Sequence, residues 1–507
     1  MAYKKQGGIL TVQGLDVSKP AEYINLENTP NCQNIRVYRD VLKKREGTSV
    51  LGGALGTYVM GGKYLIRTGV GYNVRVGTVD IELYNTGTGV WDQITGTDLT
   101  ATNADTVDFA MPLLSGQRIL CFTNGVDAVR KYIGTGNTAA LGGTPPVCKY
   151  MTEYKDYMLT GYVTTGGSTY TTRVQWCDTS NPENWSTGNA GSKDLNDDNE
   201  DITAVKTFGE YVAVHKRSSI YLGYLVSSTA VFRFDKKAVG AGTIAHTTIQ
   251  NLPGGLQAYL AVDGIRLFNG ASSEVVPAPM NDEIRETLNF QYVKYSWSLV
   301  VPELDEYWVG VPVGSSQVGD TVYKFNYKTG AAHKDKRSNV ISAWNYVNAV
   351  VLTWNDIAVS WDSYPERWDS NASGISTFIP LFGDTAGYTT DRDTTVNNDN
   401  AVAIDAFWES KDFEADEKGR LARWMQSEIW ALGNGVTVDY STDGGLTWNS
   451  PTTFTLESDY PSDDSPDIYY FDVVASRFRL RFRNSTAGET FSLKQFSVSY
   501  VNREARK

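Results

Sequence analysis

The sequence predicts an all-β protein: a β-propeller with a C-terminal β-sandwich-like domain and an N-terminal extension. A short run of alternating apolar and polar residues, with an aromatic near its end and a Gly- or Asn-containing turn after it, recurs along the chain. Four of the five spacings between copies are roughly 35 to 57 residues, near the size of a four-stranded propeller blade. Because short polar turns leave no room for helical crossovers, the strands must form antiparallel meanders. The copies occupy residues 79–87, 128–134, 219–223, 263–270, 321–330 and 356–361.

Length and composition support this class. A chain of 507 residues is too long for one ordinary core, and two or three domains are expected. Hydrophobic residues make up 41% and aromatic residues 12% of the chain, and the abundant Tyr, Thr, Val and Gly favour strands and turns. We predict three parts: residues 1–50 as an extension that contacts neighbours, 51–400 as the propeller and 401–507 as the sandwich.

Two segments depart from the repeated pattern. Residues 280–288 have the pattern of a short helix, which Asn281 or Asp282 could cap, and we interpret it as a connector between blades. Residues 389–400 are polar and short of apolar anchors, so we interpret them as a mobile loop or linker before the C-terminal domain.

Two basic segments are candidates for contacts with partners. The group Arg39, Lys43, Lys44 and Arg45 forms either a patch for an acidic neighbour or a solvated edge strand. In residues 477–483, four arginines share one face of a strand and three apolar residues share the other, which must be core. The arginine face is either a partner interface or a solvated face paired with carboxylates of a neighbouring strand. Its members are Arg477, Arg479, Arg481 and Arg483.

Several functional classes are excluded or disfavoured. No apolar run is long enough to span a bilayer, and the N-terminus lacks the apolar core of a signal peptide. The 46 basic and 58 acidic side chains give a net charge of −12, which is unsuited to gripping nucleic acid, although an acidic passage would let DNA slide. We expect free thiols in a reducing cytoplasm, no metal site and no cofactor. The cysteines are Cys32, Cys121, Cys148 and Cys177, and the histidines are His215, His246 and His333.

The sharpest local motif is SxDxGxTW at residues 441–448, an Asp-box. The carboxylate accepts hydrogen bonds across a tight turn, the glycine takes a left-handed conformation and the tryptophan packs under the hairpin. Sialidases carry several such boxes, so an exoglycosidase is an alternative, but one copy outside the propeller and no catalytic constellation disfavour it. The motif residues are Ser441, Asp443, Gly445, Thr447 and Trp448.

Residues 194–201 form an acidic stretch with oxygen ligands at alternate positions. It lacks the glycine and the bidentate glutamate of a calcium loop, since Val205 stands at the twelfth position, and a solvated loop is favoured. A second acidic loop at 459–467 is interpreted in the same way. No GxSxG elbow and no phosphate-binding loop is present. The carboxylates of the first stretch are Asp194, Asp197, Asp198, Glu200 and Asp201.

Several phrases, taken in order, resemble the β-propeller hub or nozzle proteins of bacteriophage tails, of the phage stabilisation protein and tail tubular protein B type. The resemblance begins with residues 34–48, which look like the opening strand of that family. It continues through FTNGVD at 122–127, SNPENWS at 180–186 and residues 202–221. VDGIRLFNG at 262–270, Ile284 in the short helix and the Asp-box hairpin follow in the expected order.

The resemblance implies a structural virion protein without enzymatic activity, assembled in the host cytoplasm. It would form a ring, expected to be hexameric, below the portal and adaptor. It would provide a conduit for genome ejection and a platform for fibres or spikes, and DNA would pass without specific binding. The acidic stretch 194–201 is then a candidate for a channel-facing loop. A sialidase-like exoglycosidase and a glycan- or receptor-binding tail module remain the alternatives.

Overall fold

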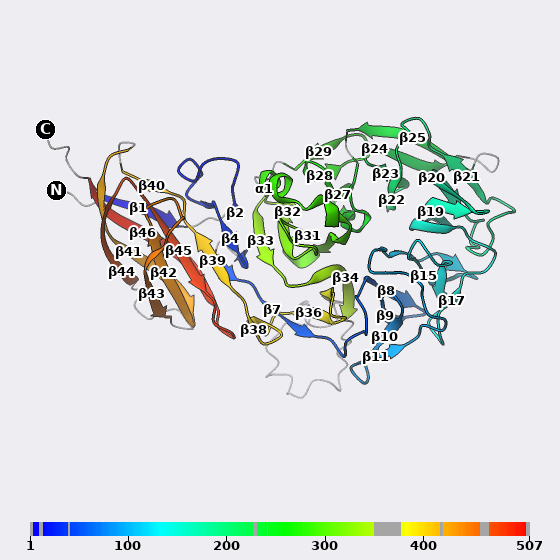
Figure 1. Ribbon diagram of the computed structural model, residues 1–507, viewed down its shortest axis with the longest axis horizontal. Helices are drawn as coiled ribbons and strands as arrows, with labels where there is room; N and C mark the ends of the chain where they lie inside the picture. Colours follow the sequence, from blue (N-terminus) through cyan, green and yellow to red (C-terminus); the bar gives the residue numbers. More distant parts are fainter. Residues whose placement is uncertain are drawn as a thin grey trace, which may run out of the picture.

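The computed structural model of the protein describes residues 4–9, 14–38, 41–226, 231–240, 242–276, 278, 280–348, 377–415, 419–456 and 466–502. These residues form a β-propeller and a β-sandwich, which lie side by side along the longest axis of the molecule (Figure 1). The predicted fold class is therefore confirmed.

In the described part of the chain, seven antiparallel sheets of at least four strands surround one axis, and we number them as blades in chain order. Blade 1 comprises β8 (Gly61–Arg67), β9 (Val70–Val76), β10 (Ile81–Asn85) and β11 (Val90–Gln93). Blade 2 comprises β12 (Asp108–Ala110), β15 (Leu120–Thr123), β16 (Arg130–Tyr132) and β17 (Ala139–Ala140). Blade 3 comprises β18 (Val147–Tyr154), β19 (Tyr157–Thr165), β20 (Ser168–Trp176) and β21 (Gly191–Asp194). A small hairpin of β13 (Leu113–Leu114) and β14 (Gln117–Arg118) projects from blade 2.

Blades 4 to 6 continue the same order of strands. Blade 4 comprises β22 (Ile202–Phe208), β23 (Tyr211–Lys216), β24 (Ser219–Leu225) and β25 (Phe232–Val239). Blade 5 comprises β26 (Gln250–Leu252), β27 (Leu256–Ala261), β28 (Gly264–Phe268) and β29 (Ser273–Val275). Blade 6 comprises β30 (Trp297–Val301), β31 (Glu306–Val311), β32 (Thr321–Asn326) and β33 (Ala332–Lys336). The copies of the repeated pattern at 79–87, 128–134, 219–223, 263–270 and 321–330 each coincide with all or part of the third strand of a blade. The phrase at 356–361 lies outside the described residues.

Blade 7 combines strands from two distant parts of the sequence. Its strands are β34 (Val340–Asn348), β35 (Thr377–Asp384), β36 (Thr389–Asp393) and, from the N-terminal segment, β7 (Gly47–Val50). β7 pairs with β36 in antiparallel register, with Ser49 opposite Asp391, so the chain closes its own ring. β37 (Asn398–Asp399) and β38 (Val402–Ala403) extend this sheet. The interpretation of residues 389–400 as a mobile linker is therefore wrong, because backbone pairing with β35 and β7 holds residues 389–393 as a strand.

Apolar side chains fill the seams between neighbouring blades. One cluster joins blades 1 and 2 through Leu65 and Phe122, and another joins blades 3 and 4 through Trp176 and Val214. Equivalent clusters lie between blades 2 and 3, 4 and 5, 5 and 6, and 6 and 7. The ring closes between blades 7 and 1, where the buried Trp344 lies against Leu55 and Val59. Each blade is thus supported on both faces, which makes the propeller rigid.

The sandwich contains two antiparallel sheets and uses strands from both ends of the chain (Figure 1). One sheet holds β44 (Asp467–Ala475), β41 (Ala422–Gly433), β46 (Phe491–Asn502), β6 (Val41–Lys44) and β5 (Ile35–Tyr38), with β1 (Lys4–Ile9) also on β46. The other holds β4 (Cys32–Gln33), β39 (Ala406–Glu409), β45 (Arg477–Asn484), β42 (Gly435–Ser441) and β43 (Asn449–Thr455), with β40 (Phe413–Glu414) on β45. Trp424 of the first sheet stacks on Phe478 of the second, with ring centroids 5.1 Å apart.

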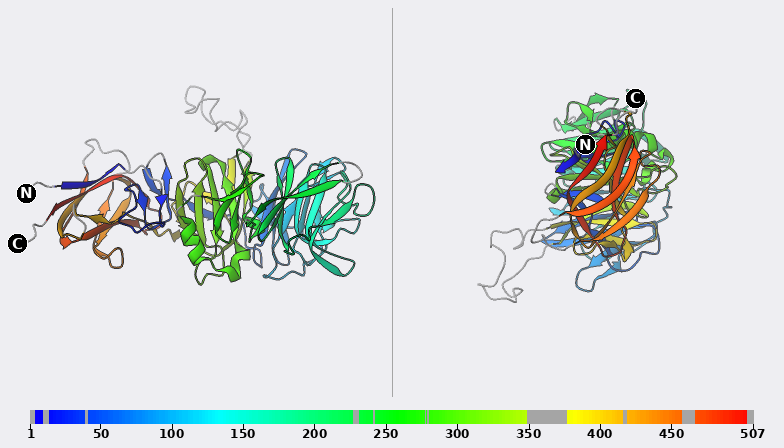
Figure 2. Two further views of the ribbon diagram at one scale, coloured as in Figure 1. Left: turned by 90° about the horizontal axis from the view of Figure 1, so that it is seen from above. Right: turned by 90° about the vertical axis from the view of Figure 1, so that its left-hand side faces the viewer.

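The N-terminal segment connects the two bodies. β2 (Gly14–Leu15) pairs with β33 of blade 6 and with β3 (Asn28–Thr29), while β4 to β6 belong to the sandwich and β7 to blade 7. A single apolar cluster runs from Tyr307 and Tyr323 of blade 6 to Trp408 and Phe496 of the sandwich. In the view from above, the two bodies follow one another in a row (Figure 2).

The basic group of the N-terminal segment is not an exposed patch. Lys44 is 1% exposed and its Nζ donates to Asn484 Oδ1 at 2.8 Å, while Arg45 is 1% exposed and binds Asp399. Lys43 is only partly buried, and Arg39 lies outside the described residues. Both predicted alternatives for this group are wrong for Lys44 and Arg45. Their burial leaves no exposed patch for a partner, and β6 is not an edge strand because it pairs with β5 on one side and β46 on the other.

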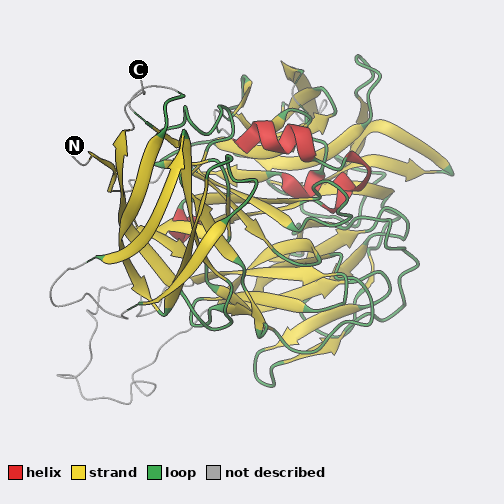
Figure 3. Ribbon diagram, turned by 60° about the vertical axis from the view of Figure 1, so that its left-hand side comes forward, coloured by secondary structure: helices red, strands yellow, loops and turns green. Residues whose placement is uncertain are grey.

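One α-helix occurs in the described residues, α1 (Met280–Thr287), between blades 5 and 6 (Figure 3). Met280 and Ile284 are buried against the propeller. Asn281 does not cap the helix: its Oδ1 accepts from the Ile265 N–H at 2.9 Å and its Nδ2 donates to the Val276 carbonyl at 2.7 Å, which fixes α1 to blade 5. The 3₁₀ helices η1 (His246–Thr248), η2 (Phe290–Tyr295) and η3 (Pro302–Leu304) complete the helical structure described.

Candidate functional site

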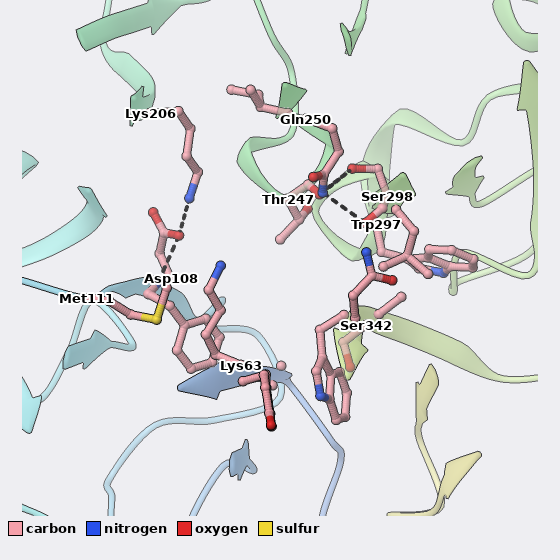
Figure 4. A pocket seen from close by; sticks show the side chains of 18 of the residues that line it. Lys63, Asp108, Met111, Lys206, Thr247, Gln250, Trp297, Ser298 and Ser342 are labelled. Carbon is pink, nitrogen blue, oxygen red and sulfur yellow. Dashed lines mark hydrogen bonds and ion pairs between the residues drawn. The ribbon is translucent and has the colours of Figure 1, made fainter. Parts of the chain in front are cut away.

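A cavity of about 640 Å³ lies at the axis of the propeller, and residues from all seven blades line it. The inner strands supply most of these residues, since the first strand of every blade faces the axis. Figure 4 shows two walls that face each other: Lys63, Asp108 and Lys206 on one side, and Gln250, Trp297 and Ser298 on the other. The volume is within the range of small-molecule sites, roughly 300 to 1,000 Å³.

The first wall carries charged groups from four successive blades. Asp108 of β12 forms an ion pair with Lys206 of β22. Its carboxylate also accepts hydrogen bonds from the backbone N–H groups of Phe109 and Met151, at 2.9 and 3.0 Å. Glu153 of β18 accepts from the Met111 N–H at 3.0 Å. Both carboxylates are therefore fixed by the scaffold.

Lys63 of β8 is the exception among these charged groups. Its ammonium forms no ion pair or hydrogen bond with any other residue that the structure describes. Desolvation by the surrounding protein lowers the pKa of Lys63, although the nearby Glu153 carboxylate opposes this effect. The Lys63 ammonium thus has no direct ion-pair partner among the described residues.

The second wall is a network of amides and hydroxyls. Gln250 Nε2 donates to the carbonyl and the hydroxyl of Ser298, both at 3.1 Å, and Ser298 Oγ donates to the Thr247 carbonyl at 3.0 Å. Asn251 and Gln257 form a second chain of hydrogen bonds, in which Gln257 Nε2 donates to Asn251 Oδ1 at 2.9 Å. These bonds fix the orientation of the side-chain amides.

His215, His333 and the four cysteines are structural. His215 and His333 are buried, and desolvation lowers the pKa of each from 6.5 to about 4. All four cysteines are buried free thiols, and burial raises the pKa of Cys177 to about 11. Among the residues that the structure describes, no group of three or more His, Cys, Asp or Glu side chains could hold a metal ion. No helix in that part of the chain is long and apolar enough to cross a membrane.

The acidic stretch 194–201 connects the outer strand of blade 3 to the inner strand of blade 4, and cations of these blades bind its first carboxylates. Asp194 forms a bidentate pair with Arg173, at 2.6 and 2.8 Å. Asp198 binds Lys216 and Lys236. Although burial acts to raise it, hydrogen bonds from Lys216 and other donors hold the pKa of Asp198 well below its usual range.

The other carboxylates of the stretch differ in their hydrogen bonding and in their exposure to solvent. Asp197 accepts from the Tyr221 hydroxyl at 2.6 Å but remains 58% exposed, and Glu200 accepts from the hydroxyl of Ser218 at 2.7 Å. Asp201 is exposed. The stretch is thus a well-anchored loop that presents Asp197 and Asp201 to solvent. Of the second acidic loop, residues 459–465 lie outside the described residues.

The Asp-box forms the expected turn between β42 and β43. Asp443 Oδ1 accepts from the Thr447 N–H at 2.9 Å, Asp443 Oδ2 accepts from the Thr447 hydroxyl at 2.6 Å, and Ser441 Oγ accepts from the Gly445 N–H at 2.8 Å. Gly445 has a φ of 91°, in the left-handed region. Trp448 lies under the Arg481 guanidinium, 4.2 Å from the ring centroid. The motif residues therefore stabilise the turn between β42 and β43.

The arginines of β45 are bound within the chain. Arg479 Nε donates to Asp412 Oδ1 at 2.8 Å and its Nη1 donates to Glu409 Oε2 at 3.0 Å. Arg481 and Arg483 share Asp439. Exposed guanidinium surface is concentrated on Arg477 and Arg483, with side-chain exposures of 42% and 36%. The opposite face, Phe478, Leu480 and Phe482, is fully buried.

Sequence reasoning did not single out the cavity residues. Lys63, Asp108, Glu153 and Lys206 each lie on the first strand of a blade, and in the sequence they resemble the polar positions of any solvated strand. One signal was available: a charged residue in the first strand of four consecutive blades, where the pattern of a propeller places side chains around the axis.

Comparisons with known proteins leave the family open. No protein-family profile matches the sequence, and no curated protein matches it. Among solved structures, the chain is similar to an exo-β-1,3-galactanase from Phanerochaete chrysosporium, with a TM-score of 0.29 and 10% identity over 89% of this chain and 100% of that chain. It is also similar to BamB from Moraxella catarrhalis, with a TM-score of 0.34 and 10% identity over 77% of this chain and 97% of that chain. Likenesses at these TM-scores carry no argument about function.

Proposed function

We propose that the protein is a structural component of a bacteriophage tail, a hub or nozzle subunit that assembles into a ring around the path of the genome. The observation that carries the proposal is the rigid connection of propeller and sandwich by one N-terminal segment. This segment supplies β2 and β7 to the propeller and β4 to β6 to the sandwich, and a continuous apolar cluster joins the two bodies. A rigid elongated subunit is suited to a closed ring, because flexible joints would spoil its symmetry.

The charge distribution supports a conduit. The net charge is −12, and the anchored loop 194–201, which presents Asp197 and Asp201 to solvent, connects β21 to β22 in the half of the propeller that lies away from the sandwich (Figure 1). Carboxylates that face a bore would repel DNA phosphates and keep the genome from adhering. The exposed Arg477 and Arg483 are the candidate contacts of β45 with an acidic adaptor, fibre or spike.

A glycan- or receptor-binding tail module is a second candidate, and the axial cavity favours it over a sialidase. A sialidase needs a cluster of arginines, whereas Arg118 is the only arginine among the cavity-lining residues that the structure describes. Asp108 is held by Lys206 and by two backbone N–H groups, which leaves it poorly placed to act as a catalytic acid.

Deletion of the gene from the parent phage, with complementation in trans, tests the proposal. Particles without the protein should have filled heads, lack the distal tail and fail to infect, and the wild-type chain should restore all three properties. Complete tails that release DNA normally but no longer adsorb to cells would contradict the conduit and favour the receptor-binding module. Hydrolysis of a fluorogenic sialoside by the purified chain would favour the enzyme.

A further inference from the structure

The axial cavity leaves three polar groups without partners in the described chain. The first is the Lys63 ammonium, which extends from β8 between Asp108 and Gln250 (Figure 4). The second is Gln250 Oε1, since only the amide nitrogen of this side chain is hydrogen-bonded. The third is Asn345 Oδ1, which is buried and accepts no hydrogen bond. These three groups are one cation and two amide acceptors.

The orientation of both amides follows from their bonded nitrogens. Gln250 Nε2 donates to the Ser298 carbonyl at 3.1 Å, and Asn345 Nδ2 donates to the Val300 carbonyl at 3.0 Å. Reversing either amide would place an oxygen against a carbonyl oxygen, so each free atom is an acceptor. A ligand that satisfies them must bring hydroxyl or amine donors.

The Lys63 ammonium forms no direct ion pair in the described chain, although the nearby Glu153 carboxylate favours its charged form. Asp108 is paired with Lys206, and Glu153 is held by the Met111 N–H. A desolvated ammonium without a direct hydrogen-bonded partner is costly, and a ligand carboxylate would offset that cost through charge-assisted hydrogen bonds. Aromatic residues also line the cavity and provide flat apolar surface: Phe109, Trp297 and Trp344.

We propose that the axial cavity is a binding site for a small sugar acid. The carboxylate lies against Lys63, and ring hydroxyls donate to Gln250 Oε1 and Asn345 Oδ1. A volume of about 640 Å³ accommodates one or two sugar rings. This inference does not depend on the tail function, since it rests on the cavity alone.

Calorimetric titration of the purified full chain with sodium galacturonate, galactose and sodium acetate tests the proposal. Galacturonate should bind, and galactose and acetate should bind at least tenfold more weakly, because each lacks one half of the complementary groups. Lys63→Met, which keeps the apolar stem of the side chain, should weaken galacturonate binding by on the order of tenfold or more. Lys193→Met should leave binding unchanged, because Lys193 is exposed on β21 and does not line the cavity.

Three outcomes would overturn the proposal: no galacturonate binding by the folded wild-type chain, equal binding of galactose, or equal binding of acetate. Equal affinity of the Lys63→Met variant would also overturn it. If that variant does not fold, crystals of the wild-type chain soaked in galacturonate give the second measurement. Ligand density in contact with Lys63 would support the site, and its absence there would contradict it.

Discussion

The guanidinium of Arg45 forms a bidentate pair with the carboxylate of Asp399, with Nη1–Oδ1 and Nη2–Oδ2 distances of 2.9 and 2.5 Å. Arg45 follows β6 of the sandwich, and Asp399 lies in β37, which extends blade 7. The same guanidinium donates to Asn34 Oδ1 and to the Lys336 carbonyl. One buried side chain therefore ties the N-terminal segment to the closure of the propeller and to blade 6.

Arg45→Met should destabilise the protein strongly. The substitution leaves Asp399 and the fully buried Asp335 without this cation, and removing one partner of a buried ion pair costs about 3 to 5 kcal/mol. The urea-unfolding midpoint should fall accordingly. Lys43→Met, two residues earlier on β6 and partly exposed, is the matched control and should change the free energy of unfolding by less than about 0.5 kcal/mol. Equal effects of the two substitutions would contradict the proposed role of Arg45.

Arg479→Ala should unfold the sandwich more readily than Arg477→Ala. Arg479 is buried between Glu409 and Asp412, and its loss leaves Glu409 without its ion pair and Asp412 with only the more distant Arg477. We expect a cost of about 3 to 5 kcal/mol. The Arg477 guanidinium is 42% exposed and lies 3.7 Å from Asp412, so its loss should cost at most about 1 kcal/mol. Chemical denaturation of both variants provides the measurement, and a fully stable Arg479→Ala would show that the buried network contributes little.

Gly62→Ala tests the seam that closes the propeller ring. A Cβ at Gly62 would overlap the Trp344 indole, which packs between blades 7 and 1. Overpacking of this kind costs about 1 to 3 kcal/mol and should lower the thermal midpoint. Gly53→Ala is the control, since a Cβ there meets no atom within 4 Å. A Gly62→Ala midpoint equal to that of the control would show that the seam adjusts freely.

Stability should fall as the pH is lowered from 6.5 towards 4. The unfolded chain protonates His215 and His333 near pH 6.5, whereas burial lowers the pKa of both in the folded state to about 4. The unfolded state therefore binds more protons in this interval, and each histidine removes up to about 3 kcal/mol by pH 4. Urea midpoints at several pH values measure the slope. Replacing both histidines by glutamine should flatten the slope between pH 6.5 and 5, and an unchanged slope would assign it to other groups.

Asp197→Asn with Asp201→Asn should slow genome release if the loop 194–201 faces the bore. These two carboxylates are exposed, so their neutralisation leaves the structural pairs of Asp194 and Asp198 in place. Asp98→Asn, at an exposed position in the connection between blades 1 and 2, is the control. Fluorescence of a DNA-binding dye reports the rate of ejection. Unchanged kinetics in fully assembled particles would place the loop away from the path of the DNA.

The strands that could be predicted from the sequence are those in which apolar and polar residues alternate within a single short segment. Five of the repeated phrases contain the third strand of a blade, because that strand combines an apolar face with a closing turn. The third strand of blade 3, β20 (Ser168–Trp176), was missed, since its first half is a run of Ser, Thr and Tyr without clear alternation.

Strands that depend on distant partners could not be recognised in the same way. β36 is polar throughout, and it is held as a strand between β35, its neighbour in the chain, and β7, more than 300 residues earlier. The cavity depended equally on long-range structure. Lys63 and Gln250 belong to blades 1 and 5, and only the closed ring brings their side chains to one axis.

Electron cryomicroscopy of the virion that contains this chain tests the central claim most directly. The account predicts a six-fold ring on the tail axis, below the portal and adaptor, with a bore continuous with the path of the DNA. A peripheral or trimeric position, or absence from the particle, would contradict it.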